Sequence, residues 1–455
     1  MVSMKQLSGK IVPVALLVMA PSLACTQEAD PVVRGYLSGV VTVSAALDST
    51  GDYSGIEIIV TDGVQDGPDT LGYAVTGEDG SFATYIVADE RGVYPLIMKR
   101  RGAVLSVNEF VVVDGDTALL RAELPLGQRL PSIRSRENSA WTAFKNAEAQ
   151  HSSRVVEMMR SGQASQESFR RAIELGAEVL WSIRGSFPGT MGAGVASAKS
   201  VVMLDGWNDS LLVARMHELD PAQPGFLEGV QAAGRAETRL RGLDSGIALL
   251  RSKRTAAAQN EAKAGIQREI ALAYIDARER TLALQAVDSL TLQYTDSAWG
   301  AWAERARYEI ENLFPGDPAP KLDLATRHGG RVNLDSLHGR PVVVEFWSPR
   351  DREHTAQLTA ISSLLANDSS GVQWVSVGLE FDEDLYDAFF EGRDVPGVQI
   401  HDERSLMDDL IVRYNVETVP TRYLIDPEGR IYEKYVGASL GRLARDLQQF
   451  AKTDG

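Results

Sequence analysis

The sequence predicts a multidomain protein with three successive parts: an all-β sandwich, an α-helical bundle or repeat-like region, and an α/β domain. Three observations lead to this prediction. The 455 residues exceed the roughly 150 that one domain usually holds. Short runs of β-branched and aromatic residues, separated by glycine turns, fill residues 34–126, and apolar residues at helical spacing fill residues 137–313. From residue 318 to residue 455, strand-like and helix-like stretches alternate.

The first 25 residues have the pattern of an export signal. A charged start is followed by the apolar run Ile11 to Ala20, which is too short to span a bilayer, and then by small residues. Residues 22–25 read Ser-Leu-Ala-Cys, which resembles a bacterial lipobox and implies a lipid on Cys25. Ordinary cleavage after Ala24 is the alternative. We therefore expect an exported protein of the cell envelope or periplasm, anchored to the membrane through the lipid on Cys25.

The composition excludes several classes of function. The formal net charge of −16 leaves no basic surface for phosphate groups, so we expect no nucleic-acid partner. No second apolar run reaches the roughly 18 residues that a transmembrane helix needs. Cys25 is the one cysteine in the sequence, so the chain can form no internal disulfide. No motif indicates a cofactor.

Two short motifs characterise residues 34–126. They are TGEDGSF at residues 76–82 and GVYPL at residues 92–96. Together they resemble the carboxypeptidase regulatory-like modules of exported bacterial proteins. The resemblance implies a β-sandwich that acts as a spacer or binding module and not as a catalyst. Asp79 precedes a glycine, a pair typical of hairpin turns, which explains this acidic residue better than a calcium site does.

Residues 137–313 carry apolar residues at the spacing of α-helices, with one clear stripe from Phe169 to Leu180. A glycine-rich loop at residues 187–194 follows no strand and lacks the Lys-Ser/Thr of a phosphate loop, so we assign no nucleotide site. Tyr274 and Tyr308 are separated by about 34 residues, the length of a tetratricopeptide-type repeat. An ordinary antiparallel bundle is the alternative. Helical arrays of this kind mostly serve contact with other proteins.

Residues 318–455 alternate between strand and helix patterns and close with a β-hairpin and a last helix. Three motifs occur in order: GDPAPKLDL at residues 316–324, LHGRPVVVEFWSP at residues 337–349, and YNVETVPTRYLIDPEGRI at residues 414–431. Together they resemble the TlpA-like thiol:disulfide oxidoreductases and redoxins of the thioredoxin superfamily. The resemblance implies an α/β thioredoxin-like fold for this domain.

The resemblance also locates the family's redox site, at which this chain departs from the pattern. Aligning Phe346 and Trp347 with the family's Phe-Trp pair places Asp351 at the first cysteine of the CxxC motif and His354 at the second. Neither side chain can form a mixed disulfide. Thiol exchange through a CxxC pair is therefore excluded, and so is thiol peroxidase chemistry at this turn.

Opposite the turn, the resemblance implies a loop that contains a cis proline. Its residues in this chain are Val419, Pro420 and Thr421. In the family this loop binds an extended substrate peptide. Since the backbone of the loop does not depend on the cysteines, we expect that it can still hold such a peptide.

Two interpretations of Asp351 and His354 stay open. Asp351 suits the start of a helix, where a carboxylate caps free amide groups and interacts favourably with the helix dipole. Alternatively, Asp351, His354 and His401 converge in a metal or acid–base site. Asp-x-x-His places both side chains on one helical face, and histidine together with carboxylate suits several divalent ions.

Three hypotheses for the function follow. In the first, the cysteine-free domain is a binding or scaffold module that holds an envelope protein or peptide, with Trp347, Arg350 and Arg352 at the binding turn. In the second, it is a thiol-disulfide oxidoreductase or antioxidant-type redoxin that acts through non-standard groups or through the thiols of a partner. In the third, it binds a metal at the former CxxC turn. No residue is assigned a catalytic role.

Overall fold

The computed structural model describes eight segments of the chain. They are residues 32–44, 50–63, 69–126, 131–162, 165–380, 382–401, 404–437 and 439–450. The predicted export signal at residues 1–25, with the lipidation candidate Cys25, lies outside the described residues. The chain divides into two compact units, residues 1–141 and 142–455. None of the described helices combines the length and the apolar character that crossing a membrane requires.

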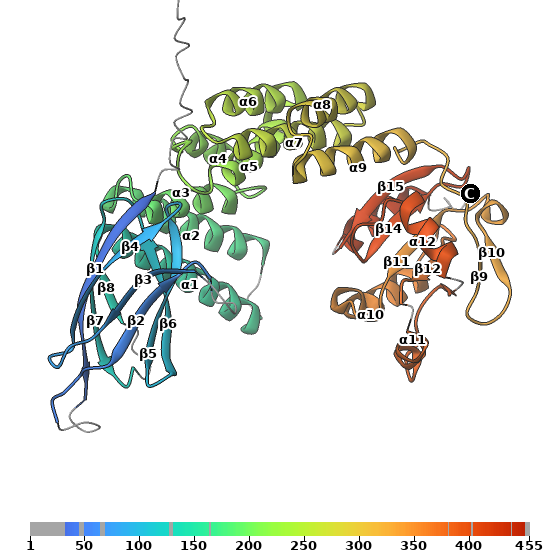
Figure 1. Cartoon of the computed structure of the whole chain (residues 1–455). Coiled ribbons are helices and arrows are strands. Elements are labelled where there is room, and N and C mark those ends of the chain that lie inside the picture. The colour runs from blue at the N-terminus through green and yellow to red at the C-terminus, as the bar shows by residue number, and fades with distance from the viewer. Residues whose placement is uncertain are drawn as a thin grey trace, which may run out of the picture. The chain divides into compact units, whose positions relative to one another are not determined.

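The first unit contains two four-stranded sheets with an apolar core between them (Figure 1). The strands lie in the order β4-β1-β7-β8 in one sheet and β3-β2-β5-β6 in the other. Their bounds are β1 Val33–Val43, β2 Ile56–Thr61, β3 Thr70–Val75, β4 Ser81–Ala88, β5 Gly92–Arg100, β6 Ala103–Val112, β7 Thr117–Leu124 and β8 Ser132–Arg134. Buried residues recur at every second position of β1, with Leu37 and Val41 fully inside. The predicted all-β first part is confirmed.

This β unit extends beyond residue 126, where the sequence predicted its end. Strand β8 pairs antiparallel with β7, and Ile133 lies opposite Leu120. The helix that follows is tied to β6 through Asn138, whose side chain is almost fully buried. Its Oδ1 accepts from the Val111 amide at 2.9 Å, and its Nδ2 donates to the Val111 carbonyl at 3.2 Å. A three-residue strand carries too little pattern to be recognised in the sequence, which explains the misplaced boundary.

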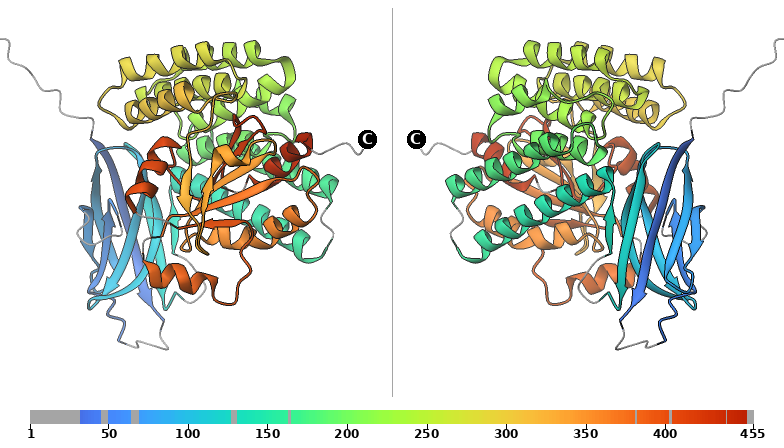
Figure 2. Two further views of the ribbon diagram at one scale, coloured as in Figure 1. Left: turned by 90° about the vertical axis from the view of Figure 1, so that its right-hand side faces the viewer. Right: turned by 90° about the vertical axis from the view of Figure 1, so that its left-hand side faces the viewer.

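Helices fill the predicted interval 137–313. Their bounds are α1 Arg136–Arg160, α2 Gln166–Ser186, α3 Met191–Met203, α4 Asp209–Met216, α5 Phe226–Arg241, α6 Leu243–Ala256, α7 Asn260–Asp276, α8 Arg280–Gln293 and α9 Ala298–Asn312. From α2 to α9, neighbours in sequence pack together, and α3, α5, α7 and α9 each pack against the next in that series (Figure 1, Figure 2). One apolar core runs through α2 to α9, which we call the helical array.

Hydrogen bonds in the helical array recur between residues that are 34 positions apart. They join Glu174 to Asn208, Arg184 to Glu218, Gly189 to Gln223, Asp205 to Arg239, Arg235 to Glu269, and Asn260 to Tyr294. A constant offset means that equivalent positions of successive hairpins face one another, as stacked repeats require. Of the two predicted arrangements, these contacts favour the repeat-like one.

The second unit ends in a five-stranded sheet of order β13-β12-β11-β14-β15, which we call the sheet domain together with its helices. The bounds are β9 Asp323–Ala325, β10 Arg331–Asn333, β11 Val342–Trp347, α10 Arg352–Ala366, β12 Gln373–Gly378, α11 Glu383–Phe390, β13 Val398–Ile400, α12 Arg404–Arg413, β14 Thr421–Ile425, β15 Ile431–Val436 and α13 Leu440–Leu447. Val344 and Phe346 of β11 pack with α12, whereas Val343 packs with α10 and α13. The predicted α/β fold, with helices on both faces of the sheet, is confirmed.

Polar contacts fix α9 of the helical array to the sheet domain. The Tyr308 hydroxyl donates to the carbonyl of Arg413 at 3.1 Å. Lys434 of β15 pairs with Glu309 at 2.7 Å. Tyr308 therefore lies where the array ends directly against the sheet domain.

Replacing Asn138 by alanine is expected to loosen β6 locally. The change leaves the buried amide and carbonyl of Val111 without their side-chain partner, at a cost of roughly 1–3 kcal/mol. Hydrogen–deuterium exchange should show faster exchange in peptides that contain Val111. Asn108→Ala is the matched control, because half-buried Asn108 donates to another side chain, Ser106, at 2.9 Å. Equal acceleration in both variants would contradict the role of Asn138.

Candidate functional site

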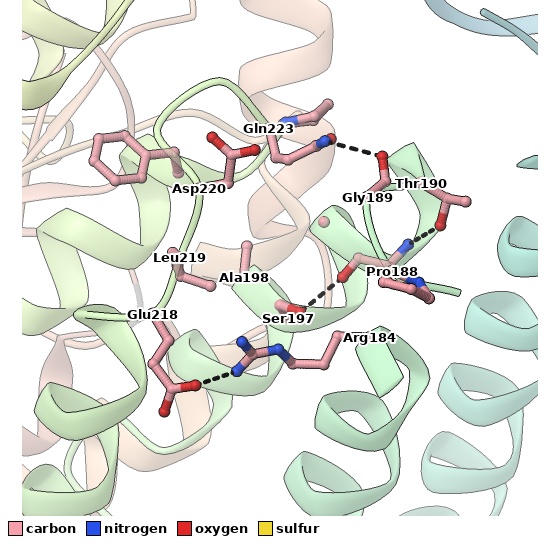
Figure 3. Close-up of a pocket in the computed structure, with 14 residues that line it drawn as sticks. Arg184, Pro188, Gly189, Thr190, Ser197, Ala198, Glu218, Leu219, Asp220 and Gln223 are labelled. Carbon is pink, nitrogen blue, oxygen red and sulfur yellow. Dashed lines mark hydrogen bonds and ion pairs between the residues drawn. The ribbon is translucent and has the colours of Figure 1, made fainter. Parts of the chain in front are cut away.

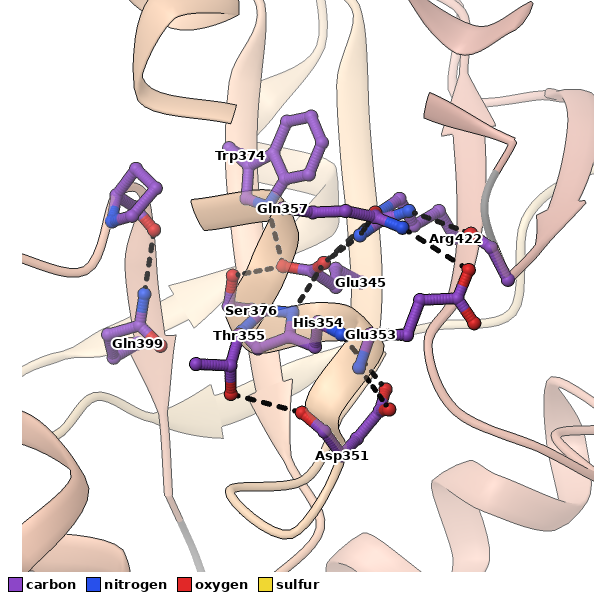
Figure 4. A network of polar contacts seen from close by, with 12 residues as sticks. Glu345, Asp351, Glu353, His354, Thr355, Gln357, Trp374, Ser376, Gln399 and Arg422 are labelled. Atoms are coloured by element: carbon purple, nitrogen blue, oxygen red, sulfur yellow. Dashed lines mark hydrogen bonds and ion pairs between the residues drawn. The ribbon is translucent and has the colours of Figure 1, made fainter. Parts of the chain in front are cut away.

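The turn that follows β11 begins helix α10, and Asp351 caps this helix (Figure 4). Its carboxylate accepts from the amide of Glu353 at 2.9 Å and from the amide of His354 at 3.3 Å. Its backbone carbonyl accepts from the hydroxyl of Thr355 at 3.0 Å. Both carboxylate oxygens therefore satisfy free amide groups at the helix start, which is the first of the two predicted interpretations.

His354 lies inside the domain and not on the turn surface. It is 1% exposed, and its ring stacks on Trp347 with 4.6 Å between centroids. Its Nδ1 lies 3.2 Å from Oε1 of Glu345. Trp347 is fully buried as well and packs against Phe389 of α11. Trp347, which the sequence analysis placed at the binding turn, therefore lies inside the domain together with His354, and neither side chain reaches solvent.

Glu345 is the centre of a buried polar network that the sequence reading missed (Figure 4). Its carboxylate accepts from Nε of Arg422 at 2.9 Å, from the indole of Trp374 at 2.9 Å and from the hydroxyl of Ser376 at 2.9 Å. Arg422 also donates to Gln357 at 2.8 Å. The sequence does contain a sign of this network, because Glu345 and Arg422 are charged residues within otherwise mostly apolar strands. The antiparallel register places these two residues directly opposite each other.

The partners of Glu345 keep its carboxylate charged. Complete burial raises the pKa of a carboxyl group, but the hydrogen bond from His354 and the charge of Arg422 lower it more. The result is a pKa of about 2 for Glu345, below its ordinary value of 4.5. The site therefore contains a permanent buried ion pair and no carboxylic acid ready to donate a proton near neutral pH.

Two buried nitrogen atoms of this site lack a hydrogen-bond partner among the described residues. They are Nε2 of His354 and Nε1 of Trp347. His401, which was predicted to join a metal or acid–base site, stacks on Tyr386 with 4.1 Å between centroids. Within the part of the chain that the structure describes, no cluster of three or more His, Cys, Asp and Glu side chains is arranged to hold a metal. The positions of the family's cysteines therefore hold no thiol, and the imidazole at the second of them is buried.

The accessible part of the turn carries two arginines beside the exposed carboxylate of Glu353. Arg350 pairs with Glu380 at 2.7 Å, while 66% of its side-chain surface remains exposed. This pairing raises the pKa of the Arg350 guanidinium still further, so the group is always charged. Arg352, at the first turn of α10, is exposed and has no ion pair among the described residues. The two predicted binding arginines thus do lie on the surface.

The loop before β14 lies beside this turn. Phe346 pairs with Thr421, so Pro420 lies next to the end of β11 where the turn begins. The Val419–Pro420 peptide bond is cis. Pro420 accepts from the amide of Gly437 at 2.9 Å. The backbone amide and carbonyl of half-buried Val419 form no hydrogen bond with any residue that the structure describes, and they are therefore free to pair with another chain.

A separate hollow of about 230 Å³ lies in the helical array, beside the glycine-rich loop at residues 187–194 (Figure 3). Arg184 pairs with Glu218 at 2.6 Å beside it. Gln223 donates to the carbonyl of Gly189 at 3.4 Å. These contacts join two hairpins of the array, and the arginine that could have met a phosphate is already paired. Arg184, the arginine of this lining, therefore has its charge matched by Glu218.

Glu345→Gln is expected to destabilise the sheet domain in a pH-dependent way. An unfolded glutamate titrates near 4.5, whereas folded Glu345 has a pKa of about 2. The ion pair therefore contributes stability that is present above pH 4.5 and lost as the pH falls toward 2, on the order of 3 kcal/mol. Urea unfolding, followed by tryptophan fluorescence, should show a large deficit for the variant at pH 7 that shrinks in acid.

Glu353→Gln is the matched control for this prediction. Glu353 lies on the exposed side of the same helix, where it accepts from Gln357 at 3.4 Å. Removing an exposed charge of this kind changes the free energy of unfolding by less than about 0.5 kcal/mol. A deficit for Glu345→Gln that stayed constant between pH 7 and pH 3 would show that Glu345 is not charged in the folded domain.

The sheet domain is similar to known proteins. The model of the AhpC/TSA family matches residues 315–434. The thiol-disulfide oxidoreductase ResA of Oceanobacillus iheyensis is 31% identical over 142 residues, which cover 30% of this chain and 72% of ResA. The thioredoxin-like protein YneN of Bacillus subtilis is 24% identical over 144 residues, which cover 31% of this chain and 82% of that protein.

Solved structures match the same share of the chain. The thioredoxin domain of a thiol-disulfide oxidoreductase from Bacteroides vulgatus is 21% identical, with a TM-score of 0.28, and the match covers 30% of this chain and 98% of that one. The family match includes Asp351 and His354, at which this chain has no cysteine. Through its C-terminal domain the chain belongs to the AhpC/TSA family of thioredoxin-like redoxins and is homologous to the ResA- and TlpA-like thiol-disulfide oxidoreductases.

Proposed function

We propose that this protein is an exported, lipid-anchored thioredoxin-fold module that binds an extended peptide segment of an envelope protein without thiol exchange. One observation carries the proposal. The two positions that correspond to the family's cysteines hold a helix cap, Asp351, and a buried, stacked imidazole, His354. Neither group can attack a disulfide, so what the turn offers to a partner is shape and charge.

The loop at Val419 supplies the backbone groups for such binding. Its free amide and carbonyl can pair with an extended peptide in the way that a strand adds to a sheet edge. Arg350 and Arg352 lie on the neighbouring turn with their charged groups in solvent. A peptide that carries acidic residues on the side of these arginines would gain favourable electrostatic contacts, which mainly increase specificity and the association rate.

The N-terminal residues would determine the location of the protein. Residues 22–25 supply the lipobox-like stretch, and Cys25 would carry the lipid. A lipid anchor would hold the β unit, the helical array and the sheet domain at a membrane surface. There the β unit serves as a spacer or binding module.

A second candidate function is that of an oxidoreductase that uses the thiols of a partner. The similarity to ResA, a thiol-disulfide oxidoreductase, favours it. It requires the partner to supply both sulfur atoms of the exchange, because the one cysteine of this chain precedes all described residues. The two candidates differ in whether the purified protein accelerates disulfide reduction by an added thiol.

We expect the protein with Cys25→Ser not to accelerate the reduction of insulin by dithiothreitol. Thiol exchange needs a thiolate nucleophile, and this variant has none. The turbidity of precipitating insulin chains measures the rate, and the expected rate equals that of the sample without protein. Acceleration above that blank would overturn the binding proposal in favour of the second candidate.

Capture of partners from an envelope extract tests the binding proposal directly. The double variant Arg350→Glu/Arg352→Glu is expected to capture at least about tenfold less partner than the wild type, because the charges of both arginines are reversed. The control is Arg340→Glu/Arg445→Glu, which reverses two exposed arginines of the same domain. Equal capture by the wild type and both double variants would show that the turn is not the binding surface.

A further inference from the structure

A hollow of about 320 Å³ lies where the helical array meets the sheet domain. Its apolar lining comes from Leu272 and Ile275 of α7, Trp302 and Ile310 of α9, and Leu313. Ile310 and Leu313 are buried, while the other three are partly accessible from the hollow. The volume is at the lower end of the about 300–1,000 Å³ usual for ligand sites, so the hollow suits one or two side chains and not a folded partner.

The charged groups at the rim of the hollow are paired, with one exception. Glu309 pairs with Lys434 at 2.7 Å, and Glu433 pairs with Arg442 at 3.1 Å. Asp276, at the end of α7, forms no hydrogen bond or ion pair among the described residues, while burial raises the pKa of its carboxyl group and the charge of Arg442 lowers it. The one carboxylate left over favours a cationic group at this side of the hollow.

The hollow is lined in part by the stretch of chain that leads into the loop of the proposed peptide site. Asn415 and Glu417 belong to its lining, and Val419 follows two residues later in the chain. Two extended residues span at most about 7 Å, so a peptide paired with Val419 needs only a few further residues to reach the hollow. The array fixes this stretch, because Asn415 donates to Glu309 at 2.9 Å and Glu417 pairs with Arg305 at 3.0 Å.

We propose that the hollow anchors the peptide bound at the Val419 loop. A large apolar side chain of the peptide enters the hollow, and a neighbouring lysine or arginine of the peptide pairs with Asp276. This inference rests on the proposed function and goes beyond it, because it names the residue types that the partner carries. Apolar burial supplies affinity, and the basic residue fixes the direction in which the peptide lies.

A random phage-displayed library of 12-residue peptides, panned on the full-length protein, tests the inference. Enriched sequences are expected to place a lysine or arginine within about two residues of a large apolar residue. The dissociation constant of a synthetic peptide with the enriched sequence should rise by about tenfold in Asp276→Lys, as expected when one ion pair is replaced by repulsion. Asp244→Lys, at an exposed aspartate of α6, is the matched control and should leave binding unchanged.

The outcomes separate this inference from the proposed function. Binding that is weakened by Arg350→Glu/Arg352→Glu but not by Asp276→Lys supports the loop site and overturns the role of the hollow. Binding weakened by Asp276→Lys alone supports the hollow and overturns the loop site. No enrichment, or enrichment of sequences without basic residues, overturns the inference. The melting temperatures of Asp276→Lys and Asp244→Lys, measured in parallel, show whether a loss of binding comes from loss of the fold.

Discussion

Glu345 and Arg422 bring opposite charges into the middle of the sheet, on neighbouring strands where water cannot reach them. Removing two charges from water costs several kcal/mol each, which is recovered only if the pair has good geometry and further hydrogen bonds. Trp374 and Ser376 supply such bonds to the carboxylate, and Gln357 supplies one to the guanidinium. Neither strand can shift by one residue without leaving a buried charge alone. The pair therefore fixes the register of β11 and β14, and with it the position of the turn and the loop that extend from them.

His354 depends on the same pair. Its Nδ1 lies against Glu345 and its ring against Trp347, so an imidazole occupies the space below the helix start. Asp351 completes the arrangement by capping the helix from outside. The two positions that correspond to the family's cysteines have thus become structural in different ways, one through electrostatics at the surface and one through packing in the core. A site built in this way keeps its shape without any sulfur, which is consistent with recognition and not with exchange chemistry.

The elements of the sheet domain were predictable because they follow local patterns. Strand β11, for example, is an apolar run that ends at a turn. The positions of Asp351 and His354 followed from the Phe-Trp motif. Whether a side chain at the helix start points outward or inward depends instead on what lies beneath it, here Glu345, and that residue is explained only by its partner 77 positions away on β14. Contacts between residues so far apart in the sequence produce no periodic pattern. A charged residue inside an apolar strand nevertheless indicates that it has a buried partner.

The helical array and the sheet domain are linked through the stretch that precedes Pro420. Glu309 of α9 contacts both Asn415 and Lys434, so one carboxylate holds the stretch and strand β15 together. Because Val419 follows this stretch, the place where a peptide could pair with the loop is set by the array as much as by the sheet. An array without the sheet domain would lack the loop, and a sheet domain without α9 would have the loop but not its support. The proposed peptide site therefore depends on the junction of the array and the sheet domain.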